Sequence, residues 1–153
     1  MRVIGLVVFF CFISLTTYSQ DEGNNTVSLE VFPIETEFTG GRLMLNYEHL
    51  FSWKHNLLLR AGIWPDFQND GVTFLLTVQG LTGRNNKHNF EYGIGSAVII
   101  DYFEDKTHYG FVPDVLIGYR FHMHKGFMFR TTVNLFVGWP TMPSLSFSAG
   151  YRF

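Results

Sequence analysis

The ten residues at the carboxy-terminus, 144–153, read SLSFSAGYRF. Every second residue, from Leu145 to Phe153, is apolar or aromatic, and the residues between them are Ser, Gly or Arg. Alternation with a period of two is typical of a β-strand that has one apolar and one polar face. The sequence therefore predicts an amphipathic strand that ends on an aromatic residue.

Seven earlier segments alternate in the same way, and none has the period of an amphipathic helix. In one of them Leu43 and Leu45 alternate with Arg42 and Asn46. A tilted strand needs about 9–11 residues to cross the hydrocarbon layer of a membrane, and only a closed sheet leaves no unpaired backbone groups in lipid. We therefore predict an all-β, eight-stranded antiparallel up-and-down transmembrane β-barrel. The seven segments are residues 26–31, 42–48, 56–63, 74–79, 89–98, 114–121 and 127–135.

The first nineteen residues have the features of a secretory signal peptide. Arg2 precedes an apolar run that is too short to span a bilayer, and small residues follow near Ser19. We expect residues 1–19 to be cleaved and residues 20–153 to form the barrel. Cys11 lies inside the apolar run without the small residues that a lipoprotein site needs before it, so the mature chain would contain no cysteine.

Composition excludes several other classes of function. After removal of Arg2 the mature chain carries 10 basic and 13 acidic residues, a formal charge of −3, so no basic surplus points to nucleic acid. No apolar stretch of the mature part approaches the ~20 residues of a transmembrane helix. An aromatic content of 18% and 15 glycines fit a membrane barrel better than a soluble enzyme.

Several strand phrases carry a family resemblance. They are LNYE at 45–48, LLRAG at 58–62, EYGIG at 91–95, and GYRF at both 118–121 and 150–153. Together they resemble the small, largely uncharacterised outer-membrane β-barrel proteins of Bacteroidota. The final strand, through Phe147, Tyr151 and Phe153, also resembles the signal by which such barrels are recognised for assembly.

This resemblance implies a location in the cell outer membrane. It also implies contact with outer-membrane lipid and lipopolysaccharide, and recognition by the barrel assembly machinery. It supplies no catalytic or cofactor-binding residues, and it names no partner protein.

The connections predict an orientation for the barrel. Three connections are short and basic: residues 50–55, 83–87 and 122–126. Four others are on average longer: residues 33–40, 64–72, 101–110 and 138–143. The first three of these longer connections are acidic. Outer-membrane barrels have short periplasmic turns and longer external loops, so the second set should face outside. We expect residues 101–110 to be the most mobile external loop. Trp53, Trp64 and Trp139 should lie near the membrane boundaries.

The predicted inward faces carry a nearly balanced set of charges. An eight-stranded barrel is just filled by its side chains, so ionised groups inside must pair or meet water. One interpretation is a salt-bridge plug, and the other is a polar path for a small solute. The narrow lumen favours the plug. The residues are Glu30, Arg42, Glu48, Arg60, Glu91, Asp114, Arg120, Arg130 and Arg152.

Metal binding finds little support in the sequence. Five of the six histidines, beginning with His49 and His55, cluster near the predicted periplasmic turns, but no carboxylate or thiolate spacing completes a zinc site. Asp66, Gln68 and Asp70 resemble the start of a calcium loop, but the twelfth position is not Glu. We predict turn chemistry at residues 69–71 and no cofactor.

Two further classes of protein fit the sequence less well. A lipid A-modifying enzyme needs a serine with a base in reach, but Ser96 has only Ile94 and Val98 as neighbours on its own face. A soluble binding barrel of lipocalin type would place the apolar faces inside, with the charges outside. The sequence favours a non-enzymatic outer-membrane barrel with a structural or surface-interaction role.

Overall fold

A computed structural model describes residues 24–34, 42–52, 56–66, 71–82, 87–103, 106–123, 126–138 and 141–153. These residues form one antiparallel sheet that closes on itself in chain order, with β1 paired to both β2 and β8. The predicted fold is thus confirmed; the signal peptide lies outside the described residues. The strands are β1 Asn25–Ile34, β2 Arg42–Ser52, β3 Leu57–Asp66, β4 Gly71–Thr82, β5 His88–Phe103, β6 Lys106–His122, β7 Phe127–Phe136 and β8 Met142–Arg152.

The seam between the first and last strands is closed by the final residue. The Phe153 N–H donates to the Asn25 carbonyl at 2.8 Å, and the Asn25 N–H donates back to the Phe153 carbonyl at 3.1 Å. The start of β1 and the end of β8 therefore lie at one end of the barrel, which we call the terminal end. The hairpins β2–β3, β4–β5 and β6–β7 turn at this end, and the other four turn at the distal end.

The β2–β3 and β6–β7 turns at the terminal end each contain a residue suited to a left-handed backbone. Asn56 precedes β3 with φ of 49°, and Gly126 precedes β7 with φ of 82°. A side chain on Gly126 would also place its Cβ 2.5 Å from the carbonyl oxygen of Arg152. Glycine is the residue that accepts both constraints at this turn.

The two faces of the sheet have the chemistry of a membrane barrel. Most outward residues are apolar, and exposed apolar side chains occur on all eight strands, while the inward set includes buried Glu, Arg, Asn, Ser and Thr side chains. A soluble barrel has the reverse arrangement, so the lipocalin alternative is wrong. Val27 is outward yet only 8% exposed, because its register partners Tyr47 and Tyr151 flank it on both sides.

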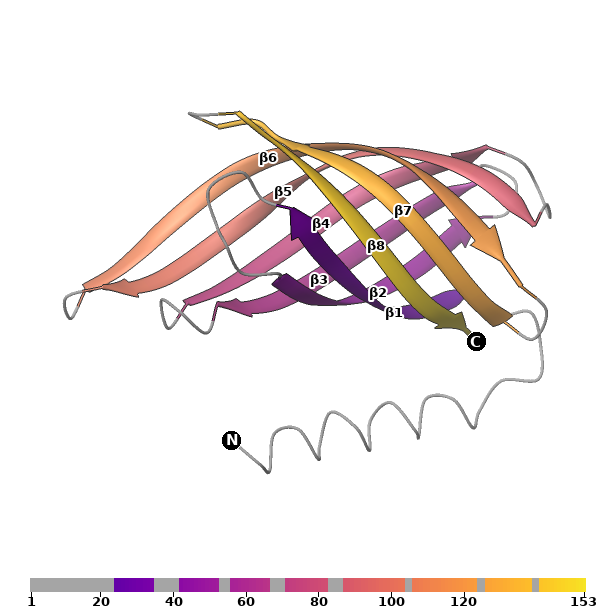
Figure 1. Cartoon of the computed structure of the whole chain (residues 1–153), viewed down its shortest axis with the longest axis horizontal. Helices are drawn as coiled ribbons and strands as arrows, with labels where there is room; N and C mark the ends of the chain where they lie inside the picture. Colours follow the sequence, from indigo (N-terminus) through magenta and orange to yellow (C-terminus); the bar gives the residue numbers. More distant parts are fainter. Residues whose placement is uncertain are drawn as a thin grey trace, which may run out of the picture.

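The prediction of a long loop at residues 101–110 is wrong. β5 continues to Phe103 and β6 starts at Lys106, with Asp101 opposite His108 in an unbroken register. These two strands extend beyond the other hairpins as a projecting ribbon (Figure 1). Connections are short at both ends, from two residues between β5 and β6 to seven between β1 and β2. The ribbon, rather than loop length, distinguishes the distal end.

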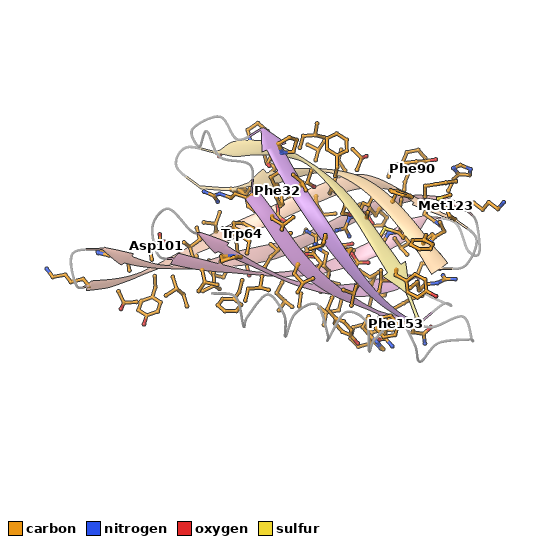
Figure 2. All side chains as sticks on the ribbon, turned by 60° about the horizontal axis from the view of Figure 1, so that its bottom comes forward. Phe32, Trp64, Phe90, Asp101, Met123 and Phe153 are labelled. Atoms are coloured by element: carbon orange, nitrogen blue, oxygen red, sulfur yellow. The ribbon has the colours of Figure 1, made fainter. Side chains whose placement is uncertain are left out.

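The prediction that Trp64 belongs to a belt of indoles at the membrane boundary is wrong. Trp64 points into the barrel, 3% exposed, and its ring centroid lies 5.8 Å from that of Phe32. Figure 2 shows both residues between Asp101 at one end of the molecule and Phe153 at the other. Trp53 and Trp139 lie outside the described residues. The distal part of the lumen is therefore filled by an apolar cluster of Phe32, Met44, Trp64, Leu75 and Ala97, with Val112 and Phe136 packed against it.

We expect Phe153 to act in two separable ways, as an aromatic assembly signal and as the residue that closes the seam. Deletion of Phe153 removes the side chain and both backbone hydrogen bonds, whereas Phe153→Ala keeps the two bonds. If the aromatic ring is the signal, both variants should reduce the heat-modifiable barrel in the outer membrane severalfold without reducing export to the periplasm. Normal levels for Phe153→Ala would assign the effect of the deletion to the seam alone.

Candidate functional site: a charged network in the barrel interior

Three carboxylates and three guanidiniums meet inside the barrel, between the terminal end and the apolar cluster. They come from six different strands, and the side chains of the six are at most 2% exposed. Each belongs to the polar phase of its strand, so the alternation that makes one face apolar directs all of them inward. We call this set the charged network: Glu30 of β1, Glu48 of β2, Arg60 of β3, Glu91 of β5, Arg120 of β6 and Arg130 of β7.

Arg130 is the hub of the charged network. Its guanidinium contacts three carboxylates on three strands: Nη2 lies 3.0 Å from Glu30 Oε2, Nη1 contacts Glu48 Oε1, and Nε lies 3.5 Å from Glu91 Oε1. A guanidinium has five N–H groups in a rigid fork, which suits it to several acceptors at once. One side chain from β7 thus reaches β1, β2 and β5 across the lumen.

The other two guanidiniums complete the ring of ion pairs. Arg120 bridges two carboxylates, with Nη1 at 2.8 Å from Glu48 Oε2 and Nη2 at 2.9 Å from Glu91 Oε2. Arg60 Nη2 lies 3.0 Å from Glu30 Oε2, on the side of the network next to the apolar cluster. Each carboxylate therefore meets two guanidiniums, as buried charges require.

Neutral side chains add contacts to the carboxylates of Glu30 and Glu91. Asn46 Nδ2 donates to Glu30 Oε2 at 2.9 Å, and Ser146 Oγ donates to Glu30 Oε1 at 2.5 Å. Thr132 Oγ1 lies 3.4 Å from Glu91 Oε1. Ser146 thereby connects β8 to the charged network. These neutral residues were not predicted from the sequence as members of the network, although their phase along the strand matches that of the charged ones.

Inward glycines make room for the charged side chains. A Cβ on Gly118 would lie 2.9 Å from Glu91 Oε1 and 2.9 Å from the Thr131 carbonyl oxygen. A Cβ on Gly62 would lie 2.5 Å from Asn46 Oδ1. Since contacts below 3.0 Å are not sustained, the lumen is filled to the point where these positions accept no side chain without a shift.

Asp114 stands apart from the ion pairs. It is buried, and neither carboxyl oxygen has a hydrogen-bond partner among the described residues. Arg60 is close enough to interact with it electrostatically but forms its ion pair with Glu30. The nearly fully buried set contains four acids and three arginines, so one negative charge is left without a matching cation if Asp114 is ionised.

The two remaining predicted members lie toward the ends of the barrel. Arg42, at the start of β2, has its guanidinium carbon 5.5 Å from the centre of the Trp64 ring, a cation–π arrangement. Arg152 is at the end of β8, with intermediate exposure. The structure thus gathers six of the nine predicted charged residues in one network and places Arg42, Arg152 and Asp114 around it.

Two of the described histidines have hydrogen-bonding partners near the terminal end. His49 Nδ1 lies 2.8 Å from Asn25 Oδ1, and His88 Nδ1 contacts the Tyr119 hydroxyl. Across the described ranges no three His, Cys, Asp or Glu side chains form a group that could hold a metal ion. Residues 67–70 of the calcium-like motif are outside those ranges, and no described helix is long and apolar enough to cross a membrane.

Solved structures that are similar to this chain include two outer-membrane barrels. One is the outer membrane protein Ail of Yersinia pestis in a phospholipid bilayer nanodisc, with a TM-score of 0.61, 13% identity, and coverage of 86% of this chain and 100% of that chain. The other is the N-terminal β-barrel domain of Pseudomonas aeruginosa OprF, with a TM-score of 0.58, 13% identity, and coverage of 86% and 99%. No protein-family model and no curated protein matches the sequence.

At this level of identity the likeness is one of fold. A closed eight-stranded antiparallel sheet, apolar outside and charged inside, defines the class: a small transmembrane β-barrel with the fold of outer-membrane proteins. The finer resemblance to the Bacteroidota proteins stays a prediction. Fold alone assigns no activity.

We expect Gly118→Ala to destabilise the barrel by about 1–3 kcal/mol, because the new methyl group displaces Glu91 or the backbone of β7. Gly110→Ala is the matched control, since the nearest atom to its Cβ would be Ile99 Cβ at an ordinary 3.4 Å. Urea unfolding in detergent micelles, followed by the change in tryptophan fluorescence, measures both. Equal midpoints for the two variants would contradict the tight fit at Gly118.

We expect the isosteric changes Glu48→Gln and Asp114→Asn to differ in effect. Glu48→Gln leaves Arg120 and Arg130 undercompensated and should lower the free energy of unfolding by about 3–5 kcal/mol. Asp114→Asn removes a charge that has no hydrogen-bond partner in the described chain, so stability should stay the same or rise. The same urea titration at neutral pH tests both. A loss for Asp114→Asn as large as that for Glu48→Gln would show that Asp114 is a working member of the network.

Proposed function

We propose that this protein is an integral outer-membrane barrel that conducts no solute and has a structural or surface-interaction role at the cell surface. The observation that carries the proposal is the charged network, whose side chains are essentially inaccessible to solvent. An eight-stranded barrel is just wide enough for its own side chains. A network that fills this width is a plug.

A second obstruction lies behind the first. Next to the charged network the lumen is filled by the apolar cluster around Phe32 and Trp64. A polar solute would have to disrupt buried ion pairs and then displace a packed indole ring. These two requirements disfavour a small-solute channel, the alternative that a charged lumen first suggests.

Location and orientation are supported by the outer surface and by the ribbon. The outward apolar residues suit a lipid environment, and the fold is shared with two outer-membrane proteins. Barrels of this class carry their longer hairpins on the external side, and β5–β6 is the longest hairpin, so we place the β5–β6 ribbon outside and the terminal end in the periplasm. Lipid and lipopolysaccharide would then surround the barrel, and the assembly machinery would act on β8.

The enzyme alternative finds no support around Ser96. Its hydroxyl is on the outward face, and its register partners are Leu76 on β4 and Pro113 on β6. His108 is fixed opposite Asp101 within the ribbon and faces the other side of the sheet. No described neighbour therefore offers Ser96 a base.

We expect the purified protein, reconstituted in planar lipid bilayers, to show no stepwise conductance, because the ion pairs close the lumen. A porin inserted under the same conditions verifies that the assay detects channels. Sustained steps from the wild-type protein would favour a small-solute channel.

We also expect a strain that lacks this protein to keep its lipid A acyl pattern, and a changed pattern would favour the enzyme.

A further inference from the structure

The projecting ribbon leaves one side of β6 without a strand. β6 pairs with β5 along its whole length, from Lys106 opposite Phe103 onward. Its pairing with β7 begins only at Asp114, opposite Phe136. Within the described part of the chain, residues 106–112 thus have a partner on one side only. We call this seven-residue stretch the β6 edge; its reach beyond the neighbouring hairpins is visible in Figure 1.

The backbone groups that point away from β5 can be identified. The Val137 N–H donates to the Pro113 carbonyl at 2.8 Å, so the backbone of Pro113 faces β7. Alternate residues of a strand direct their N–H and C=O groups to the same side. Thr107, Tyr109 and Phe111 therefore direct these groups to the open side, in a row about 13 Å long at ~3.3 Å per residue.

The β6 edge lacks the features that normally prevent strand addition. Natural edges are blocked by proline, bulges, inward charges or short length. Here the register from Lys106 to Val112 has no shift, Lys106 is at the tip, and Pro113 comes only at the base. The edge sequence, KTHYGFV, is rich in residues that favour strands, and Tyr109 and Phe111 are 76% and 70% exposed.

We propose that the β6 edge is the docking site of this protein for an extended segment of a partner polypeptide, which adds to the ribbon as a further strand. The chemistry of the edge determines which kind of partner can bind there. Alternating donors and acceptors at the strand repeat are matched by another backbone, and neither a lipid chain nor a compact solute supplies that pattern. The partner segment that fits has β-branched or aromatic residues beside Tyr109 and Phe111, and a carboxylate beside Lys106.

A second copy in the same membrane does not fit this edge. Two barrels in one membrane are related by rotation about the membrane normal, and strands of such barrels tilt by about 35–45° from it. The two β6 strands would then cross at about twice that angle instead of pairing. A segment of a different polypeptide has no such restriction.

The test uses the full mature protein in lipid nanodiscs, so it does not depend on the orientation of the barrel in cells. This inference rests on the proposed function only for the statement that the edge faces outside. The probe is a synthetic ten-residue peptide of alternating valine and threonine, with one glutamate placed to meet Lys106. Its control is the same peptide with proline at two central positions, which cannot continue a hydrogen-bonded ladder.

In the free barrel, we expect the amide hydrogens of Thr107, Tyr109 and Phe111 to exchange rapidly while those of His108 and Val112 are protected by β5. The valine–threonine peptide should slow exchange at the first three, and the proline peptide should not. Edge amides that are already protected in the free barrel, or that stay unprotected at millimolar peptide, would overturn the proposal. So would protection by lipopolysaccharide alone.

Two variants separate the contribution of the Tyr109 N–H to peptide affinity from that of the Tyr109 side chain. Tyr109→Pro removes an edge-facing N–H but none that bonds to β5, so the barrel should remain folded and heat-modifiable while peptide affinity falls at least about tenfold. Tyr109→Thr keeps the N–H and should change affinity less, as measured by fluorescence anisotropy of the labelled peptide. Unchanged affinity for Tyr109→Pro would also overturn the proposal. If the amides of His108 and Val112 lose protection in Tyr109→Pro, exchange at Thr107 and Phe111 of the wild type decides instead.

Discussion

Six charged side chains from six strands neutralise one another around Arg130, and the remaining architecture is consistent with keeping them together. A guanidinium at the centre of a narrow barrel is stable only if carboxylates surround it, and these must come from strands far apart in the sequence. Glu30 and Arg130 are separated by 100 positions yet lie 3.0 Å apart. The charged network therefore fixes the alignment of opposite walls, which backbone pairing between neighbouring strands does not do alone.

This constraint also explains the choice of register. Because side chains alternate between faces, a slip of one residue in β7 would direct Arg130 into lipid and Phe129 into the lumen. Both changes are costly: a charge near the bilayer midplane of a barrel costs about 2–4 kcal/mol, and its partners inside would be left unpaired. The tight fit around Gly118 has the same effect, since only one alignment places a glycine beside Glu91. The ion pairs of the charged network and the limited space at Gly118 thus require the same register.

Alternation along the strands was enough to predict the eight strands, the inward and outward faces, and the candidate charges. It could not predict which guanidinium meets which carboxylate, because partners such as Glu48 and Arg120 face each other across the lumen and depend on the stagger of the closed sheet. Trp64 was misplaced because the preference of indoles for membrane boundaries was given more weight than its phase, which it shares with Arg60 and Gly62. The ribbon was mistaken for a loop because its polar and aromatic residues have no apolar period, although β5 and β6 pair there in full.

Pro113 marks the boundary between the rigid barrel and the part of β6 that is open to a partner. It has no N–H, so the ladder to β7 can continue past it only through its carbonyl, which accepts from Val137. On its other side it lies opposite Ser96, at a position where β5 requires no N–H from it. One residue therefore ends the closed wall without disturbing the β5–β6 pairing. The strand pair above Pro113 keeps its unbroken register without a second neighbour on β6, and an edge strand of this kind is what a further strand can add to.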